Sequence, residues 1–237
     1  MTFDRENAAI GGQPPKDLPP AGLTPPGAIL FDWDNTLVDT WGVIHRSLNH
    51  TLTTFGLEAW TEAETKARVR KSMRDSFPAL FGSDWEEAGR TFYAYFRAHH
   101  LDGLTPKAGA ADMLADLKER GLYLGVVSNK TGDILRTEAR HLGWDRYFES
   151  LVGAGDAVRD KPDSAPIHLA LSKWEKGTGS NVWFAGDADI DLDCGRRAGL
   201  TTILIRQEPP APGEMADCPP DWHVPDCIHF SRLVTRP

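Results

Sequence analysis

Short apolar runs alternate with amphipathic segments from residue 28 onward. The runs are rich in β-branched and aromatic residues, and most are apolar throughout, which is typical of strands covered on both faces in a parallel sheet. Strands are expected at Ala28–Phe31, Leu122–Ser128, Ser150–Ala154, Asn181–Gly186 and Thr201–Arg206, and helices at Lys107–Gly121, Gly132–Gly143 and Ser164–Gly177. The three helices end on glycine, which a helix C-cap favours. This order predicts a Rossmann-like, doubly wound parallel α/β sheet.

One interval departs from this alternation. Between residues 40 and 106 the only signals are helical patterns, separated by Gly56 and by FPALFGSD, at Trp41–Phe55, Glu62–Arg74 and Trp85–His99. We therefore predict an all-helical cap domain inserted after the first strand, with the aromatic stretch WEEAGRTFYAYF in its core.

The expected division is a flexible Pro-rich leader (1–27), an α/β core (28–40 and 106–237) and the helical cap (41–105). Near the C-terminus, DWHV and FSRLV predict a short edge strand and a final turn.

Composition narrows the classes of partner. The net charge of −8 argues against wrapping nucleic acid, which favours a basic face. No stretch reaches the roughly 18 apolar residues of a membrane span, and the N-terminus lacks a signal-peptide pattern. The three cysteines form no CxxC pair, which is typical of reduced thiols in a cytoplasmic protein. The sequence leaves a monomer or a homodimer open.

Polar residues follow four of the predicted strands. Because the carboxyl ends of the strands in an open α/β sheet border the ligand crevice, we expect these residues to meet at one edge. They are Asp32, Asp34 and Thr36; Ser128, Asn129 and Lys130; Asp160 and Lys161; and Asp187, Asp189, Asp191 and Asp193. Each group alone could be a turn or a helix N-terminus. Carboxylates gathered in this way repel one another, and Mg²⁺ with an anionic substrate would balance their charge.

These residues resemble the four motifs of the haloacid dehalogenase superfamily of phosphotransferases, which are DxDxT, a Ser or Thr, a Lys, and GDxxxD. Here they read Asp32-Trp33-Asp34-Asn35-Thr36, Ser128, Lys161 and GDADID (186–191). The predicted cap resembles the C1 cap of phosphoglycolate-phosphatase-like members. Two positions depart from the usual pattern, with Asn35 where Gly is common and Ala188 where Ser or Thr is common.

The resemblance implies a role for each matched residue. Asp32 is implied to be the nucleophile that forms an aspartyl-phosphate, and Asp34 the general acid and base. Mg²⁺ is implied to be held by Asp32, the Asp34 backbone carbonyl, Asp187 and Asp191. The groups implied to bind the phosphate are Ser128, the Asn129 backbone N–H, Thr36 and Lys161.

Other nearby residues receive weaker interpretations. Lys130 is interpreted as a solvated turn residue. Lys71 or Arg74 is expected to contact an anionic part of the substrate, since they lie where related caps present a substrate loop, although a solvated basic helix face explains them equally well. The histidines, including His99 and His100, lack ligand spacing, and no role is assigned to them.

The leading hypothesis is a Mg²⁺-dependent phosphomonoesterase acting on a small phosphorylated metabolite. Phosphoglycolate is the first candidate, followed by sugar phosphates and nucleotides. A phosphomutase on the same fold and a receiver-like switch that is phosphorylated on Asp32 are the alternatives.

Overall fold

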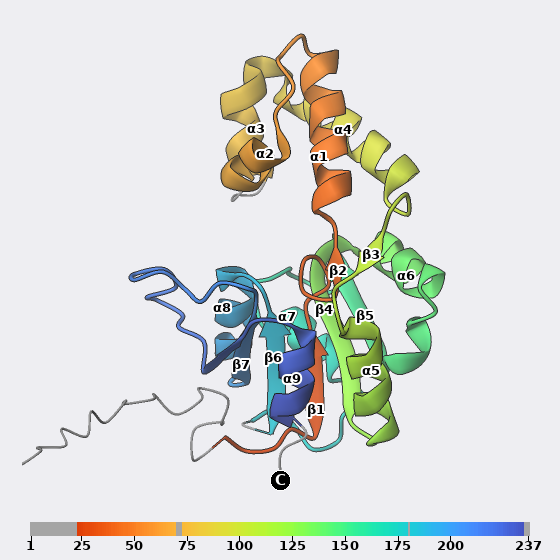
Figure 1. Cartoon of the computed structure of the whole chain (residues 1–237), viewed down its shortest axis with the longest axis vertical. Coiled ribbons are helices and arrows are strands. Elements are labelled where there is room, and N and C mark those ends of the chain that lie inside the picture. Colours follow the sequence, from red (N-terminus) through yellow and green to blue (C-terminus); the bar gives the residue numbers. More distant parts are fainter. Residues whose placement is uncertain (1–22, 70–72, 180, 235–237) are drawn as a thin grey trace, which may run out of the picture.

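The computed structural model describes residues 23–69, 73–179 and 181–234, without the side chains of residues 73–75. Its centre is a six-stranded parallel sheet in the order β5-β4-β1-β6-β7-β8 (Figure 1). The strands are β1 (Ala28–Phe31), β4 (Tyr123–Thr131), β5 (Ser150–Ala154), β6 (Val182–Gly186), β7 (Thr201–Ile205) and β8 (Trp222–Val224).

Helices cover both faces of this sheet. In β1, Ile29 and Phe31 pack into the cluster on one face, and Ala28 and Leu30 pack into the cluster on the other. The first face is covered by α5 (Ala110–Glu119), α6 (Gly132–His141) and α9 (Cys227–Val234), and the second by α7 (Ala165–Ala170) and α8 (Asp189–Arg197). Burial on both faces explains the continuous apolar runs and confirms the predicted doubly wound sheet.

The strand order places β1 where the direction of winding reverses. β1 pairs in parallel with β4 on one side and with β6 on the other. The chain runs outward from β1 through β4 to β5 and then returns to β6. Such a switch point is where ligands bind in open α/β sheets, beyond the carboxyl ends of the strands.

Four helices inserted between β1 and β4 are called the cap helices here. They are α1 (Trp41–Thr54), α2 (Glu62–Arg68), α3 (Met73–Phe81) and α4 (Trp85–His99), with a 3₁₀ turn, η1 (Gly82–Asp84), before α4. Apolar side chains of α1, α3 and α4 form a cluster of their own. The segments entering and leaving the cap helices pair as a short antiparallel ladder, β2 (Val38–Asp39) with β3 (Thr105–Pro106). This ladder lies between the sheet and the cap helices (Figure 1).

Several predicted boundaries are wrong. No single helix spans Glu62–Arg74, because α2 ends at Arg68, and FPALF does not separate helices but belongs to α3. The buried Phe77 and Phe81 of α3 pack in the cap cluster, which outweighs the amide donor that Pro78 lacks.

Other elements differ in length. β4 continues to Thr131 and α7 stops at Ala170, while a second 3₁₀ turn, η2 (Asp145–Tyr147), follows α6. The predicted edge strand is confirmed as β8, but the predicted final turn is the helix α9. The ladder of β2 and β3 was not predicted. The division into leader, core and cap domains stays a prediction, and residues 1–22 of the leader lie outside the described part.

The described helices include none that combines the length and the apolar character needed to cross a membrane. All three cysteines are free and buried.

Two glycine substitutions test the packing of β5 against the junction of β4 and α6. A Cβ on Gly153 would lie 2.4 Å from Gly132 Cα and 2.6 Å from the Lys130 carbonyl oxygen, whereas a Cβ on Gly89 in α4 would meet nothing within 4 Å. Gly153→Ala must therefore push backbone apart, and we expect it to lower the free energy of unfolding by about 1–3 kcal/mol or more. Gly89→Ala should raise it by up to about 1 kcal/mol, because alanine favours a helix. Urea unfolding of both variants measures the difference, and equal stabilities would contradict the close packing.

Candidate active site

Three carboxylates meet beyond the carboxyl ends of β1 and β6. Asp32 directly follows β1, and its backbone N–H donates to the Ala185 carbonyl of β6 at 2.8 Å. Asp187 follows β6, and Asp191 lies in the first turn of α8. One oxygen of each of these three carboxylates lies within 4.8 Å of the other two. The acids of the first and last motifs, 155 residues apart in numbering (187 − 32), therefore form one cluster.

Lys161 supplies the positive charge inside this cluster. Its Nζ lies 2.6 Å from Asp32 Oδ1 and 2.6 Å from Asp191 Oδ1, and all three side chains are buried. Burial works against the charged form of Lys161, but Asp191 and Asp32 outweigh it and raise the pKa of the lysine. The lysine thus stays protonated, and it joins the nucleophile candidate to α8.

Backbone and hydroxyl groups hold the acids in place. Thr36 Oγ1 lies within hydrogen-bond distance of both Asp187 Oδ1, at 3.2 Å, and Asp32 Oδ2, at 3.4 Å, and donates its one hydrogen between them. The Ala188 backbone N–H donates to Asp191 Oδ2 at 3.1 Å. Gly186 leaves room for Asp191, because a Cβ there would lie 2.4 Å from the Asp191 carboxylate. The binding of substrate by Thr36 stays a prediction.

The cluster is short of positive charge. Burial raises the pKa of Asp32 to about 7 even though Lys161 lowers it, with Asp191 and Asp34 adding to the rise. Burial also raises the pKa of Asp187 well above its usual range, and Asp191 and Asp32 add to this effect. Three close carboxylates beside one lysine fit a hard dication with oxygen ligands, so the residues present suit Mg²⁺.

Residues at the end of β4 and before α7 border the cluster. Ser128 is buried on β4 and accepts a hydrogen bond from the Lys130 backbone N–H at 3.2 Å. The Asn129 side chain holds the backbone of Lys161, since its Nδ2 donates to the Lys161 carbonyl at 3.1 Å and its Oδ1 accepts from the Lys161 N–H at 3.0 Å. This clamp on the lysine segment was not predicted, and phosphate binding by the Asn129 N–H stays a prediction.

Asp34 lies apart from the three clustered acids and faces a different lysine. Lys130 Nζ lies 2.6 Å from Asp34 Oδ1 and 2.6 Å from Glu138 Oε2. The interpretation of Lys130 as a solvated turn residue is therefore wrong, since its side chain is only 3% exposed. It was misread because β4 continues past Ser128 and carries Lys130 into the interior. Glu138 and His100, which also meet there, were not predicted.

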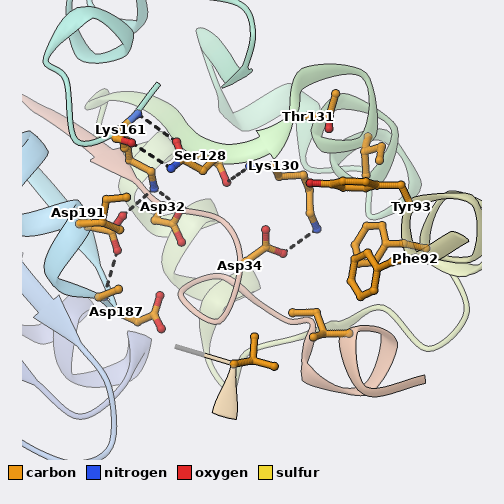
Figure 2. Close-up of a pocket in the computed structure, with 17 residues that line it drawn as sticks. Asp32, Asp34, Phe92, Tyr93, Ser128, Lys130, Thr131, Lys161, Asp187 and Asp191 are labelled. Atoms are coloured by element: carbon orange, nitrogen blue, oxygen red, sulfur yellow. Dashed lines mark hydrogen bonds and ion pairs between the residues drawn. The ribbon is translucent and has the colours of Figure 1, made fainter. Parts of the chain in front are cut away.

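A cavity of about 340 Å³ opens in front of both groups of acids. Figure 2 shows Asp32, Asp34, Ser128 and Lys161 on its core side and Phe92 and Tyr93 beside it. The cap helices and the segment after α2 line it with apolar side chains, namely Ile44, Val69, Phe92, Tyr93 and Phe96. The prediction that WEEAGRTFYAYF belongs to the cap core is thus only partly confirmed, because one face of α4 lines this cavity. Lys71 and the side chain of Arg74 lie outside the described residues.

Comparison with known proteins identifies a family. A model described as "Haloacid dehalogenase-like hydrolase" matches residues 29–205. The pyrophosphatase PpaX of Bacillus velezensis is 27% identical over 209 residues, which cover 87% of this chain and 96% of that protein. The PpaX of Bacillus pumilus is 29% identical over 177 residues, 75% of this chain and 82% of that protein.

Solved structures share the fold. A Haemophilus somnus protein described as a predicted phosphoglycolate phosphatase has a TM-score of 0.78 at 20% identity, over 90% of this chain and 100% of that one. A hydrolase of the haloacid dehalogenase superfamily from Ehrlichia chaffeensis has a TM-score of 0.63 at 25% identity, over 89% of this chain and 97% of that one.

The raised pKa of Asp32 predicts a pH-dependent stability. The ordinary carboxyl, as in the unfolded chain, releases its proton near pH 3.8, but folded Asp32 keeps it to about pH 7. Because the folded state then binds more protons, the free energy of unfolding of the metal-free chain should fall between about pH 4 and about pH 7, by on the order of a few kcal/mol. Urea unfolding in EDTA across this range measures the fall, and Mg²⁺ should stabilise the chain more at high pH than at low pH.

Asp32→Asn is the control for this pH dependence. Asparagine has no proton to release, so the free energy of unfolding of this variant should fall less over the same range. Equal slopes for the two proteins would show that Asp32 is not the group responsible.

Proposed function

Because the chain belongs to the haloacid dehalogenase-like hydrolase family, we propose that it is a Mg²⁺-dependent phosphomonoesterase acting through an aspartyl-phosphate on Asp32. The observation that carries this proposal is the separation of the two acids of the first motif. Asp32 lies in the buried cluster with Lys161, and Asp34 faces the cavity from the other side with Lys130. Asp32 belongs to the cluster that suits Mg²⁺, whose charge would favour the ionised form that a nucleophile needs, and Asp34 lines the cavity where it could meet the leaving oxygen.

The proposed reaction has two halves. In the first, an Asp32 oxygen attacks phosphorus while the bond from phosphorus to the leaving oxygen breaks, and Asp34 donates a proton to that oxygen. In the second, water attacks the aspartyl-phosphate and gives a proton to Asp34, which releases inorganic phosphate and restores Asp32. The two halves return Asp34 to its starting protonation state.

The neighbouring groups neutralise and orient the phosphoryl group. Asp32, Asp187, Asp191 and the Asp34 backbone carbonyl would hold Mg²⁺, which when bound would supply positive charge to the carboxylates and the phosphoryl oxygens. Lys161 adds its own positive charge beside Asp32, and Ser128 would donate a hydrogen bond to a phosphoryl oxygen. The apolar wall from the cap helices would exclude bulk water.

The leaving group of the substrate is proposed to be small and anionic. The resemblance of the cap suggests phosphoglycolate as the substrate, a monoester from which glycolate leaves. The relatives named pyrophosphatase suggest that inorganic pyrophosphate, an anhydride from which phosphate leaves, is hydrolysed as well. Among the described residues, the cap contributes no Lys or Arg to the cavity wall, but Val69 of that wall lies two positions before Lys71. Countercharge for such a leaving group would therefore come from Lys71 or Arg74.

A cytoplasmic location stays a prediction.

The alternatives differ in the fate of the phosphoenzyme. A phosphomutase or a receiver-like switch must protect its aspartyl-phosphate from water, whereas a phosphatase hydrolyses it rapidly. The exposure of Asp34 to the cavity argues against the switch, since a switch needs no leaving-group acid. Rapid quenching with ³²P-labelled substrate measures the lifetime of the phosphoenzyme, and a short lifetime distinguishes the phosphatase from both alternatives. Of the two long-lived cases, a mutase turns over its substrate, whereas a switch is phosphorylated without turnover.

Substitution of the acids tests the proposed chemistry. With p-nitrophenyl phosphate and Mg²⁺, Asp32→Asn should lower kcat/KM by roughly 10³-fold or more, because the nucleophile is lost. Asp189→Asn is a matched control, since Asp189 is exposed at the start of α8 and should leave the rate unchanged. Retention of activity by Asp32→Asn would overturn the proposed intermediate.

Substitution of the basic residues tests the proposed leaving group. Lys71→Ala or Arg74→Ala should lower kcat/KM for phosphoglycolate and pyrophosphate by roughly 10-fold or more, because the residue that contacts the leaving group would lose a charged hydrogen bond. Neither should change the rate with p-nitrophenyl phosphate. Lys66→Ala, at an exposed position of α2, is the control. If neither variant discriminates between the substrates, the leaving group is not bound by these residues.

A further inference from the structure

Lys130 is a buried cation between two carboxylates. Its Nζ contacts Asp34 Oδ1 and Glu138 Oε2, each at 2.6 Å, and Figure 2 shows its Nζ directed at Asp34. Burial works against its charged form, but Asp34 and Glu138 outweigh burial and raise the pKa of Lys130. A buried ammonium group is unfavourable unless carboxylates compensate its charge, and Asp34 and Glu138 do so here.

Glu138 of α6 holds this lysine in place. Its side chain is completely buried on α6 and both of its oxygens are used. Oε2 accepts from Lys130 Nζ and from Trp33 Nε1, the latter at 2.7 Å, and Oε1 contacts His100 Nδ1 at 2.9 Å. Because Trp33 lies between Asp32 and Asp34 in the chain, Glu138 holds this loop twice, once directly and once through Lys130.

Asp34 depends on Lys130 for its position. Apart from this ion pair, Asp34 Oδ1 is buried and has no hydrogen-bond partner among the described residues. The whole side chain is nevertheless 28% exposed, so the carboxylate meets the cavity through its other oxygen. Lys130 thus fixes which oxygen faces the leaving group.

Glu138 also contacts a residue at the end of the cap helices, His100. His100 directly follows α4, and its ring stacks on Phe96 with centroids 6.2 Å apart. Phe96 lines the cavity, and Lys130 Nζ lies 5.5 Å from the centre of its ring. Beside it, Arg97 of α4 pairs with Asp133 of α6 at 2.8 Å. The end of α4 is therefore anchored on the helix that carries Glu138.

We propose that Lys130 and Glu138 are positioning residues that hold the Asp34 carboxylate toward the leaving oxygen, with His100 joining this support to the end of α4. This inference rests on the proposed phosphatase function. Neither residue donates the proton itself. Their loss should therefore matter most where protonation of the leaving group matters most.

A series of leaving groups tests the proposal. The double variant Lys130→Met/Glu138→Gln removes both charges together, so no unpaired carboxylate remains at position 138. For an alkyl phosphate, whose alkoxide leaves poorly without a proton, kcat/KM should fall by roughly 10²-fold or more. For p-nitrophenyl phosphate, whose phenolate leaves without a proton, it should change by less than about 3-fold.

Three comparisons make the outcome decisive. Lys118→Met/Glu149→Gln, which alters a partly exposed ion pair in the same way, should keep the wild-type dependence on leaving group. Asp34→Asn should reproduce the dependence of the Lys130 and Glu138 variant, and combining all three changes should cost little more, because they act on one group. A loss that is equal for all substrates, or no loss, would overturn the proposal.

The remaining outcomes distinguish a failure of the positioning role from a failure of the proposed function. If the double variant does not fold, the single variant Lys130→Gln is measured on the same series and judged by the same criterion. If the wild-type chain releases no phosphate from any substrate, the proposed function fails. If it does release phosphate and only the dependence on leaving group is missing, the proposed function stands and the positioning role fails.

Discussion

The arrangement of the candidate site depends on the ion pairs that Lys161 makes with Asp32 and Asp191. These carboxylates follow strands that are adjacent in the sheet, because β1 lies at the switch point between β4 and β6. Without a cation between them, burial and mutual repulsion would favour protonated acids or an open structure. One lysine offsets only part of this charge, and the remainder leaves the site suited to a dication and a phosphate.

A second buried lysine repeats this arrangement on the other side of the first motif. Lys161 joins Asp32 to Asp191 of α8, and Lys130 joins Asp34 to Glu138 of α6. Each acid of the motif is thus tied to a helix on a different face of the sheet. The two acids are only two positions apart in the chain, yet they occupy different electrostatic surroundings, which is what distinct chemical roles require.

The cap helices both line the cavity and contact the residues that hold Asp34. One face of α4 presents Phe92 and Phe96 to the cavity, and its end is joined to the core through Arg97 and His100. Because α4 lines the cavity and is followed by His100, which contacts Glu138, the position of the cap helices is physically connected to the position of Asp34. Because the cap side of the cavity is apolar, the charged groups among the described lining residues all come from the core side.

The sequence by itself determined the parallel sheet and the order of its motifs, because fully buried strands require continuous apolar runs and their ends must carry the ligand groups. It also placed Asp32, Asp187 and Lys161 at one edge. Only the tertiary structure decided the partners of Lys130. Glu138 lies 105 positions from Trp33 and 38 from His100, and within an amphipathic helix it resembles a solvated acid. Its burial depends on α4, α6 and β4 meeting in space, which no local pattern encodes.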